Sequence, residues 1–362
     1  MKLMKTTEAV GQVLCHDITQ IIPGVKKDAV FRKGHIITKE DIPVLLSVGK
    51  DTIYIWENDE TMMHENEAAE VLYRMSACGT KKIEADTQSG VSCGTASKMH
   101  PSSVKEGKIE VIADCDGLLK VDSKKLEKVN SFGELMIATR HGNTTVKKGD
   151  KLAGTRIIPL VIKKDKLKEA SNICEDGLIL DIKPFVVRKA AIITTGNEVY
   201  HGRIQDAFTP VIEKKIAEFG AQMMFHEVFD DDDKKITDGC LRAIEAGAEI
   251  VFCTGGMSVD PDDKTPLAIK NTGARIVSYG SPVLPGAMFL LSYYDAGDRL
   301  VPICGLPGCA MYNKRTIFDI VLPRLMARDM IYADELAGLG EGGLCLNCDV
   351  CTFPNCGFGK GF

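Results

Sequence analysis

The stretch CTGGMSVDPDDKTP, residues 253–266, decides how the fold of this chain is interpreted. It ends an apolar run, turns on two adjacent glycines and then places three aspartates within four positions. Adjacent glycines let backbone amides approach an anion closely, because no side chain stands between the amides and the ligand. Carboxylates repel one another and also repel an anion, so the stretch predicts a compensating group.

A phosphate-bearing ligand together with Mg²⁺ would resolve this conflict of charges. Magnesium bridges carboxylate and phosphate oxygens, and it commonly uses only one or two protein carboxylates. The predicted magnesium ligands are Asp262 and Asp263, with the phosphate bound by Gly255 and Gly256. The turn chemistry leaves an alternative open, in which the aspartates only cap the following helix and face water.

Residues 186–330 alternate short apolar segments with amphipathic ones, which predicts a parallel sheet with helices on both faces. Strands are predicted at 186–194, 221–229, 248–254, 274–280 and 299–308, the last running into a turn. Helices are predicted at 210–220, 236–247, 266–273 and 313–328. In such sheets ligands bind beyond the carboxyl ends of the strands. The turns at 195–198, 254–263 and 305–309 lie at such ends and are expected to form one site.

The fold class expected for the whole chain is α/β, in four parts. Residues 1–60 form a small N-terminal α+β segment, and residues 61–185 form a β-rich domain. Residues 186–335 form the parallel-sheet domain flanked by helices, and residues 336–362 form a short cysteine-rich tail. The tail is rich in glycine and lacks helical or strand periodicity, so it is not expected to fold when cut from the chain.

Composition excludes several classes of protein. The net charge of −5 argues against a surface that grips nucleic acid. The N-terminus lacks the apolar core of a secretory signal, and no apolar run approaches the length of a membrane span, so a cytoplasmic location without membrane partners is expected. The odd count of 13 cysteines argues against a complete disulfide framework.

Four of these cysteines, Cys345, Cys348, Cys351 and Cys356, lie close together with the spacing C-x₂-C-x₂-C-x₄-C. This spacing is close to that of ferredoxin-type iron–sulfur sequences, and four thiolates also suit tetrahedral zinc. The sequence therefore predicts an iron–sulfur or zinc site in the tail. Free thiols, or a segment that orders only on a partner protein, are the alternatives.

Several ordered motifs within residues 186–330 resemble the molybdopterin-binding domain of molybdenum cofactor biosynthesis proteins. They are ITTGNEV (193–199), the acidic run at 230–233, TGGMSVDPDDKTP (254–266) and GLPG (305–308). Two groups of proteins carry this domain, the molybdopterin adenylyltransferases and the molybdopterin molybdenumtransferases. The stretches LCHDI (14–18) and Phe31 to Ile55 carry a weaker resemblance to the molybdenumtransferases.

The resemblance implies a set of site residues. The TGG backbone would hold the terminal phosphate of the ligand, and Asp263 would be an essential catalytic residue acting through Mg²⁺. Glu198 would lie at the pterin end, and the GLPG turn would close the other side. The implied ligand-binding residues are Thr195, Gly196, Glu198, Thr254, Gly255, Gly256, Ser258, Thr265, Gly305, Pro307 and Gly308.

The sequence also departs from the family at several positions. The serine-alanine-methionine-aspartate-glycine-tyrosine motif of the transferases is absent after Ile22. Both lysines expected around the proline-glycine turn are missing from Leu284-Pro285-Gly286-Ala287-Met288, so an anionic molybdate would lose cationic partners there. Cys309 replaces the asparagine often found after GLPG, and the cysteine tail replaces the usual C-terminal β-domain.

The expected function is binding of molybdopterin, or of its adenylylated form, in molybdenum cofactor biosynthesis. In the first reading the chain is a molybdenumtransferase-like enzyme that inserts molybdenum from molybdate with Mg²⁺. In the second it is a non-catalytic molybdopterin carrier or a maturation factor that docks on a molybdoenzyme or another biosynthesis protein. An unrelated nucleotide-binding regulator is a third reading. A homo-oligomer is expected in each of the first two.

Overall fold

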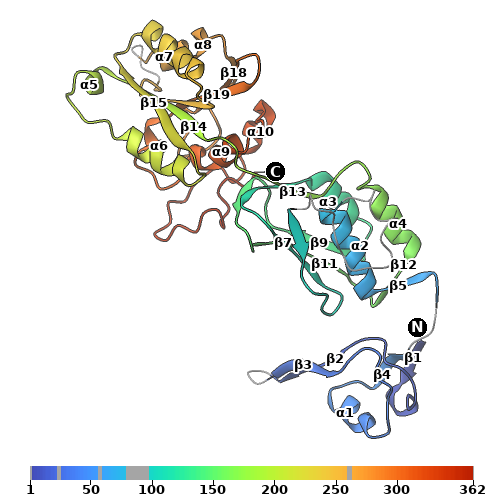
Figure 1. Ribbon diagram of the computed structural model, residues 1–362. Coiled ribbons are helices and arrows are strands. Elements are labelled where there is room, and N and C mark those ends of the chain that lie inside the picture. The colour runs from blue at the N-terminus through green and yellow to red at the C-terminus, as the bar shows by residue number, and fades with distance from the viewer. Residues whose placement is uncertain (1, 23–25, 56–58, 79–97, 259–262, 362) are drawn as a thin grey trace. The chain divides into compact units, whose positions relative to one another are not determined.

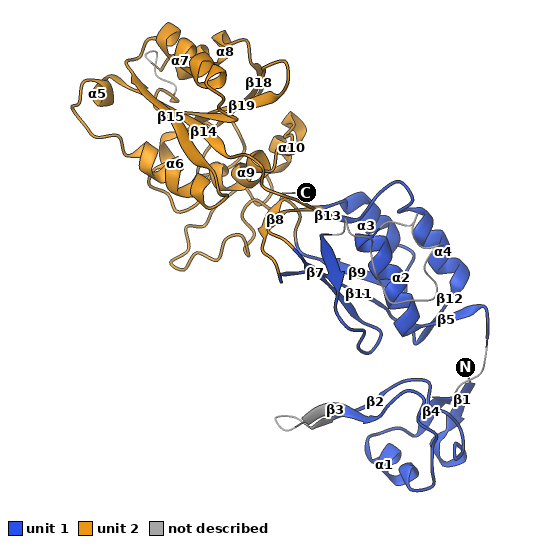
Figure 2. Ribbon diagram, viewed as in Figure 1, with its two compact units in different colours: residues 1–114, 121–140, 149–181 blue, residues 115–120, 141–148, 182–362 orange. Residues whose placement is uncertain are grey.

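The computed structural model describes residues 2–22, 26–55, 59–78, 98–258 and 263–361. The chain divides into two compact units, which are coloured separately in Figure 2. The first contains residues 1–114, 121–140 and 149–181, and the second contains residues 115–120, 141–148 and 182–362. Within the described ranges, no helix combines the length and the apolar character that crossing a bilayer requires.

The first unit begins with short strands around one helix. Strand β1 (Lys2–Lys5) pairs antiparallel with β4 (Thr52–Ile55), and β2 (Ile18–Ile22) pairs antiparallel with β3 (Lys26–Phe31). The short 3-10 helix η1 (Thr6–Glu8) and helix α1 (Asp41–Ser47) complete this part. Its small core is made of aliphatic side chains, among them Leu14, Ile18, Ile37, Leu45 and Ile53.

The rest of the first unit is built on a four-stranded antiparallel sheet. The strand order is β6 (Met99–Pro101), β7 (Ile109–Ala113), β11 (Lys151–Ile157), β9 (Leu135–Thr139). Strands β5 (Met62–His64) and β12 (Val161–Lys163) form a separate pair. Helix α2 (Glu65–Ala77) packs on β11 and β7.

Two helices of this unit, α3 (Ser123–Asn130) and α4 (Lys164–Asn172), were not predicted from the sequence. Each is rich in lysine and buries only one or two side chains, namely Val129 in α3, and Leu167 and Ala170 in α4. So little apolar periodicity gives a weak helical signal. The region is consequently less dominated by strands than the sequence suggested.

The second unit contains a six-stranded sheet with the strand order β15-β14-β16-β19-β18-β17. Strand β14 (Lys189–Thr195) lies parallel to β15 (Gln222–Phe229) and to β16 (Ile250–Thr254), and β16 lies parallel to β19 (Leu300–Leu306). Strand β18 (Leu290–Asp295) is antiparallel to β19 and to β17 (Arg275–Tyr279). The sheet is therefore mixed, which corrects the prediction of a wholly parallel sheet.

Helices cover both faces of this sheet, as Figure 1 shows. Ile192 and Phe252 belong to a core shared with α6 (Phe208–Ala217) and α9 (Ile317–Met326). Their chain neighbours Ile193 and Cys253 belong to the opposite core, shared with α7 (Asp233–Glu245) and α8 (Thr265–Asn271). This alternation follows from the two-residue period of a strand.

Helix α9 begins at Ile317, a few residues later than the predicted start at 313. The cause is a capping box: the hydroxyl of Thr316 accepts from the amide of Phe318 at 3.2 Å, and the Asp319 carboxylate accepts from the amide of Thr316 at 2.8 Å. These contacts give hydrogen-bond acceptors to amides at the start of the helix, which have no acceptor within the helix.

Three further strands lie beside each other in the order β10 (Thr144–Val146), β8 (Gly117–Val121), β13 (Leu180–Lys183). Their lysines Lys120 and Lys183 reach Asp329 at 2.8 and 2.5 Å, and Arg324 of α9 reaches the same carboxylate at 2.6 Å. The three cations thus converge on one buried acid. Segments 115–120 and 141–148 belong to the second unit although they lie far from residues 182–362 in the sequence.

The cysteine-rich tail is packed on the second unit. After α10 (Ala333–Gly338), Phe358 enters the core shared by α6 and α9, and Cys345, Phe353 and Cys356 pack against it. The backbone of Leu284 bonds to this segment on both sides, since its amide donates to Gly343 O and its carbonyl accepts from the Cys345 amide, each at 2.8 Å. The tail therefore forms part of the folded unit.

Candidate functional site

Three turns meet at the carboxyl edge of strands β14, β16 and β19, which are neighbours in the sheet. A β-carbon built on Gly255 would lie 2.1 Å from the carbonyl oxygen of Thr195, so the second turn touches the first. A β-carbon built on Gly305 would lie 2.5 Å from the sulfur of Met257, so β19 touches the same segment. The structure thus brings the turns at 195, 255 and 305 together.

Buried threonine hydroxyls fix the glycine turn from below. The hydroxyl of Thr195 donates to Thr254 O at 3.2 Å and lies 3.1 Å from the hydroxyl of Thr265. The hydroxyl of Thr265 donates in turn to Gly255 O at 2.9 Å. All three threonines are at most 4% exposed, so these bonds are shielded from water.

Glycine is required at both positions of the turn. Gly255 and Gly256 have φ values of +81° and +54°, in the left-handed region that side chains disfavour. A β-carbon on Gly256 would also lie 2.8 Å from the Thr265 hydroxyl. The backbone can pass this close to Thr195 and Thr265 only because the two turn residues, Gly255 and Gly256, have no side chain.

Carboxylates surround the edge on the side of β15. Asp230 and Asp231 follow β15, Glu198 lies on the short helix α5 (Asn197–Tyr200), and Asp263 precedes α8. Burial raises the pKa of Asp231, a hydrogen bond from the Asn197 amide lowers it, and the charges of Glu198, Asp263 and Asp230 raise it further, with a net increase. The four acids therefore share one electrostatic environment.

Two oxygens of this group are buried without a hydrogen-bond partner among the described residues: Oδ2 of Asp263 and Oδ1 of Asp230. The other oxygen of Asp230 is paired with Lys235 at 2.7 Å. A buried carboxylate oxygen without a partner is costly, so its presence calls for an explanation such as a bound ion. Burial and then the charge of Asp263 raise the pKa of Tyr279, so this tyrosine belongs to the same surroundings.

The unpartnered oxygen of Asp263 fits a magnesium ligand, because Mg²⁺ prefers carboxylate oxygen and keeps several waters. In the part of the chain that the structure describes, no three His, Cys, Asp or Glu side chains are placed to hold a metal ion together. Magnesium needs only one or two protein carboxylates, so Asp263 satisfies the smaller requirement. Asp262, the second predicted ligand, lies outside the described residues.

The remaining predicted residues line the turns in different ways. Gly196 has φ +129° and precedes α5, where Glu198 is exposed. Ser258 is exposed after the glycine turn. Pro307 is buried, whereas Gly308 is exposed at the start of the short helix η3 (Gly308–Ala310).

A polar network beneath the first turn was missed by sequence reasoning. Asp206 accepts from the hydroxyls of Thr194 and Thr209 at 3.0 and 2.5 Å, and His226 Nε2 lies 3.2 Å from each hydroxyl. Burial raises the pKa of Asp206, but the bonds from Thr209 and Thr194 outweigh burial and lower it overall. Asp206 lies in an irregular loop, and the histidines have no ligand spacing, so the sequence carried no signal for this contact.

Asp230 and Asp231 were also absent from the predicted site residues. A usable signal existed, since a run of four aspartates directly follows the predicted strand at 221–229. What the sequence lacked was the strand order, which places β15 beside β14 and so brings Asp231 within reach of Asn197.

The turn that lacks the expected lysines, Leu284 to Gly286, is occupied by other contacts. Leu284 pairs with Leu344 of the tail in an isolated parallel bridge. A β-carbon on Gly286 would lie 2.4 Å from the side chain of Ile317 at the start of α9. In this chain the turn holds the tail and a helix terminus.

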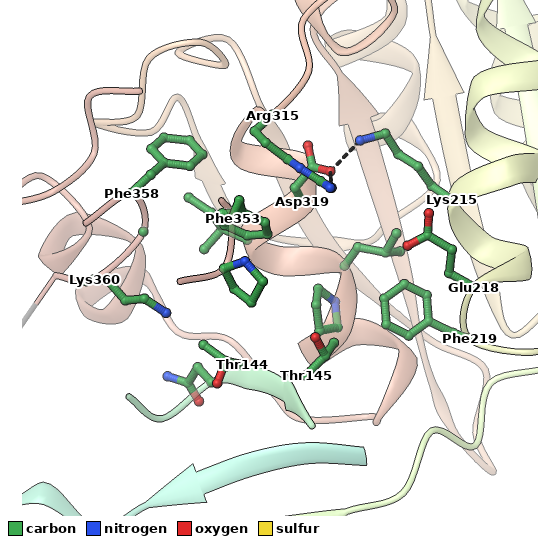
Figure 3. Close-up of a pocket in the computed structure, with 16 residues that line it drawn as sticks. Thr144, Thr145, Lys215, Glu218, Phe219, Arg315, Asp319, Phe353, Phe358 and Lys360 are labelled. Carbon is green, nitrogen blue, oxygen red and sulfur yellow. Dashed lines mark hydrogen bonds and ion pairs between the residues drawn. The ribbon is translucent and has the colours of Figure 1, made fainter. Parts of the chain in front are cut away.

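All four cysteines of the tail line one cavity of about 230 Å³. A neighbouring cavity of about 150 Å³ is drawn in Figure 3, where Lys215 and Arg315 approach Asp319 from two sides. Arg315 bonds Asp319 at 2.9 Å, and Lys215 forms an ion pair with the same carboxylate. Phe353 and Phe358 line both cavities.

Comparisons with known proteins bear on this unit. Residues 191–327 match the family model described as a probable molybdopterin binding domain, and residues 3–57 match one described as a domain of unknown function. The first match confirms the resemblance stated from the motifs. Residues 191–327, less than half of the chain, are therefore similar to this molybdopterin binding domain.

The chain spans less than half of the length of the curated relatives that it matches. A molybdopterin molybdenumtransferase of Staphylococcus epidermidis is 26% identical over 156 residues, which are 41% of this chain and 37% of the relative. A protein of Bacillus velezensis named as competence-damage inducible is 29% identical over 90 residues, 25% of this chain and 21% of the relative. The solved structure of the molybdopterin biosynthesis Mog protein from Mycobacterium ulcerans is 18% identical with a TM-score of 0.31, covering 41% of this chain and 99% of that protein.

Proposed function

We propose that the second unit binds molybdopterin, or its adenylylated form, at the edge formed by the turns at 195, 255 and 305, and that the chain acts in molybdenum cofactor biosynthesis. The observation that carries this proposal is the buried, unpartnered oxygen of Asp263 near a glycine turn that buried threonine hydroxyls hold in place. The match of residues 191–327 to the molybdopterin binding domain supports the choice of ligand.

In this proposal the backbone of Gly255 and Gly256 binds the terminal phosphate, and the buried threonines keep that backbone in place. Asp263 holds Mg²⁺, and Asp262 is proposed as a second ligand. The ion supplies positive charge between the phosphate and the carboxylates. Gly196 and the exposed residues Glu198 and Ser258 contact the pterin end, while Gly305, Pro307 and Gly308 bound the other side.

The proposed activity is molybdenum insertion of the molybdenumtransferase type, with AMP released from the adenylylated ligand. The chain contributes positioning and neutralisation of charge, because the site offers a cation-binding carboxylate and backbone donors. No covalent intermediate on the protein is needed for this role.

The Leu284–Gly286 turn favours a second candidate, a molybdopterin carrier or maturation factor without catalysis. In the described structure that turn bonds the cysteine tail instead of presenting the expected lysines. A carrier needs the phosphate cradle and the magnesium ligand but needs no cations to draw in molybdate. Both candidates share the same binding site and differ in the fate of the bound ligand.

Purified full-length chain should be mixed with adenylylated molybdopterin, Mg²⁺ and molybdate while AMP is measured. Molybdate-dependent AMP release that is lost in Asp263→Asn supports insertion, and tight Mg²⁺-dependent binding without release supports the carrier. Asp238→Asn, the same change on the exposed side of α7, is the matched control and should behave as the unsubstituted chain. Ligand binding that is equally tight in chelator, by calorimetry, would refute the shared magnesium site.

A further inference from the structure

The four tail cysteines lie within the twelve residues from Cys345 to Cys356, and their side chains face one cavity. All four line the cavity of about 230 Å³, together with the apolar side chains of Leu344, Leu346, Phe353 and Phe358. None of these cysteines is in a disulfide. Cys348 and Cys351 are exposed, whereas Cys345 and Cys356 are half-buried, so the cavity has an open side and a closed side.

The protein fixes both ends of this segment. The amide of Cys345 donates a hydrogen bond to Leu284 O at 2.8 Å. At the other end Phe358, two residues after Cys356, is only 5% exposed. In the middle, Lys314 donates to the carbonyl oxygens of Cys348 and Asp349 at 3.4 and 3.2 Å. A loop anchored at both ends and at its centre loses less conformational entropy when it binds a ligand.

The cations at the cavity wall suit a metal group ligated by cysteines. Such a group has a net negative charge when four thiolates ligate it, because the metal core offsets their charge only in part. Lys314 and Arg315 both line this cavity. Arg315 lies with its guanidinium 5.0 Å from the centre of the Phe353 ring, which fixes the cation at the wall (Figure 3).

The geometry points to an iron–sulfur cluster, ligated by Cys345, Cys348, Cys351 and Cys356, as the occupant of this cavity. A single zinc ion draws four sulfurs to about 2.3 Å from one centre. Among the described residues, no three side chains of His, Cys, Asp or Glu are grouped closely enough to hold one metal ion, so the choice of a cluster rests on the size and lining of the cavity. An iron–sulfur cluster is likewise ligated by four thiolates, and it is a larger group than a single ion.

The size and lining of the cavity support the same choice. A volume of about 230 Å³ far exceeds the roughly 10–15 Å³ that one water molecule occupies by this measure. Most of the wall is apolar, and an apolar shell around a metal group controls solvent access and reduction potential. This inference is independent of molybdopterin binding, since it involves a different part of the second unit.

The test is to purify the full chain anaerobically and to reconstitute it with ferrous iron and sulfide under reductant, without any pterin. We expect a brown protein with charge-transfer absorption in the visible range and equal amounts of iron and acid-labile sulfide. Cys348→Ser and Cys351→Ser should each lose at least half of the iron and sulfide. Both residues are exposed, so these changes should leave thermal unfolding of the colourless chain unchanged.

Cys309→Ser is the matched control, because Cys309 is half-buried like Cys345 and does not line the cavity. It should load iron and sulfide as the unsubstituted chain does. A colourless protein that binds zinc in place of iron would overturn the proposal. Equal loading of Cys351→Ser and the unsubstituted chain would overturn it as well, since the iron would then be bound nonspecifically.

Discussion

Replacing Gly255 with alanine tests whether the glycine turn needs its close approach to Thr195. The substitution places a side chain at φ +81°, which costs about 1–2 kcal/mol. It also places a β-carbon 2.1 Å from the Thr195 carbonyl oxygen, and such overpacking costs about 1–3 kcal/mol more. The free energy of unfolding should therefore fall by about 2–5 kcal/mol in total.

Gly273→Ala is the control, because it separates the two costs. Gly273 follows α8 with φ +84°, nearly the value at Gly255, and a β-carbon there would meet no atom within 4 Å. It should lose only the conformational share, about 1–2 kcal/mol. The difference between the two variants measures the contact with Thr195.

Urea unfolding followed by far-ultraviolet circular dichroism would measure both variants. With a typical urea dependence of ~1–3 kcal/mol per molar, the midpoint of Gly255→Ala should lie about 1 M below that of Gly273→Ala. Binding of molybdopterin in Mg²⁺ should be lost in Gly255→Ala and kept in Gly273→Ala. Equal midpoints and equal binding in the two variants would refute the proposed role of the turn.

Two further predictions concern the packing of the second unit. Burial raises the pKa of the Asp329 carboxyl, but Lys120, Lys183 and Arg324 outweigh burial and lower it to about 2. These ion pairs should contribute about 2 kcal/mol to the free energy of unfolding. That contribution should be complete above the ordinary pKa of an aspartate and should be lost as the pH falls from about 4 to 2. Asp329→Asn should lower the free energy of unfolding by about 3–5 kcal/mol at neutral pH and should remove the loss of stability between pH 4 and 2. Asp298→Asn breaks only an exposed pair with Arg299 and should lower the free energy of unfolding by under about 1 kcal/mol. Phe358→Ala should cost about 3–5 kcal/mol and make the tail sensitive to protease, and an unchanged urea midpoint would show that the tail does not pack on this core.

The sequence predicted the centre of the second unit well because its signals there are local. Apolar runs that end at Thr195, Thr254 and Leu306 are bounded by glycine, and the helices between them have regular periodicity. Strand β18 escaped prediction for a physical reason. Its residues, LLSYYD, form a short, mostly buried run after a proline-glycine turn, and periodicity alone cannot tell such a run from a segment of buried helix.

The candidate site depends on contacts that only the folded chain defines. The turns could be placed at one edge because parallel strands share their carboxyl ends. The Asp206 network and the neighbourhood of Asp231 depend on β15 lying next to β14, a pairing that the order of elements along the chain does not determine. The packing of the tail could not be predicted either, because its glycine-rich composition gives no pattern that marks Phe358 as a buried residue.

The balance of charge at the site explains why magnesium dependence is the decisive observation for function. Glu198, Asp230, Asp231 and Asp263 gather around the glycine turn, and Lys235 is already paired with Asp230. The turn at Leu284, where the sequence resemblance led us to expect lysines, bonds instead to the tail. An anionic ligand therefore meets net negative charge unless a divalent cation joins it, so its affinity should depend on Mg²⁺ more steeply than in a site that retains those lysines.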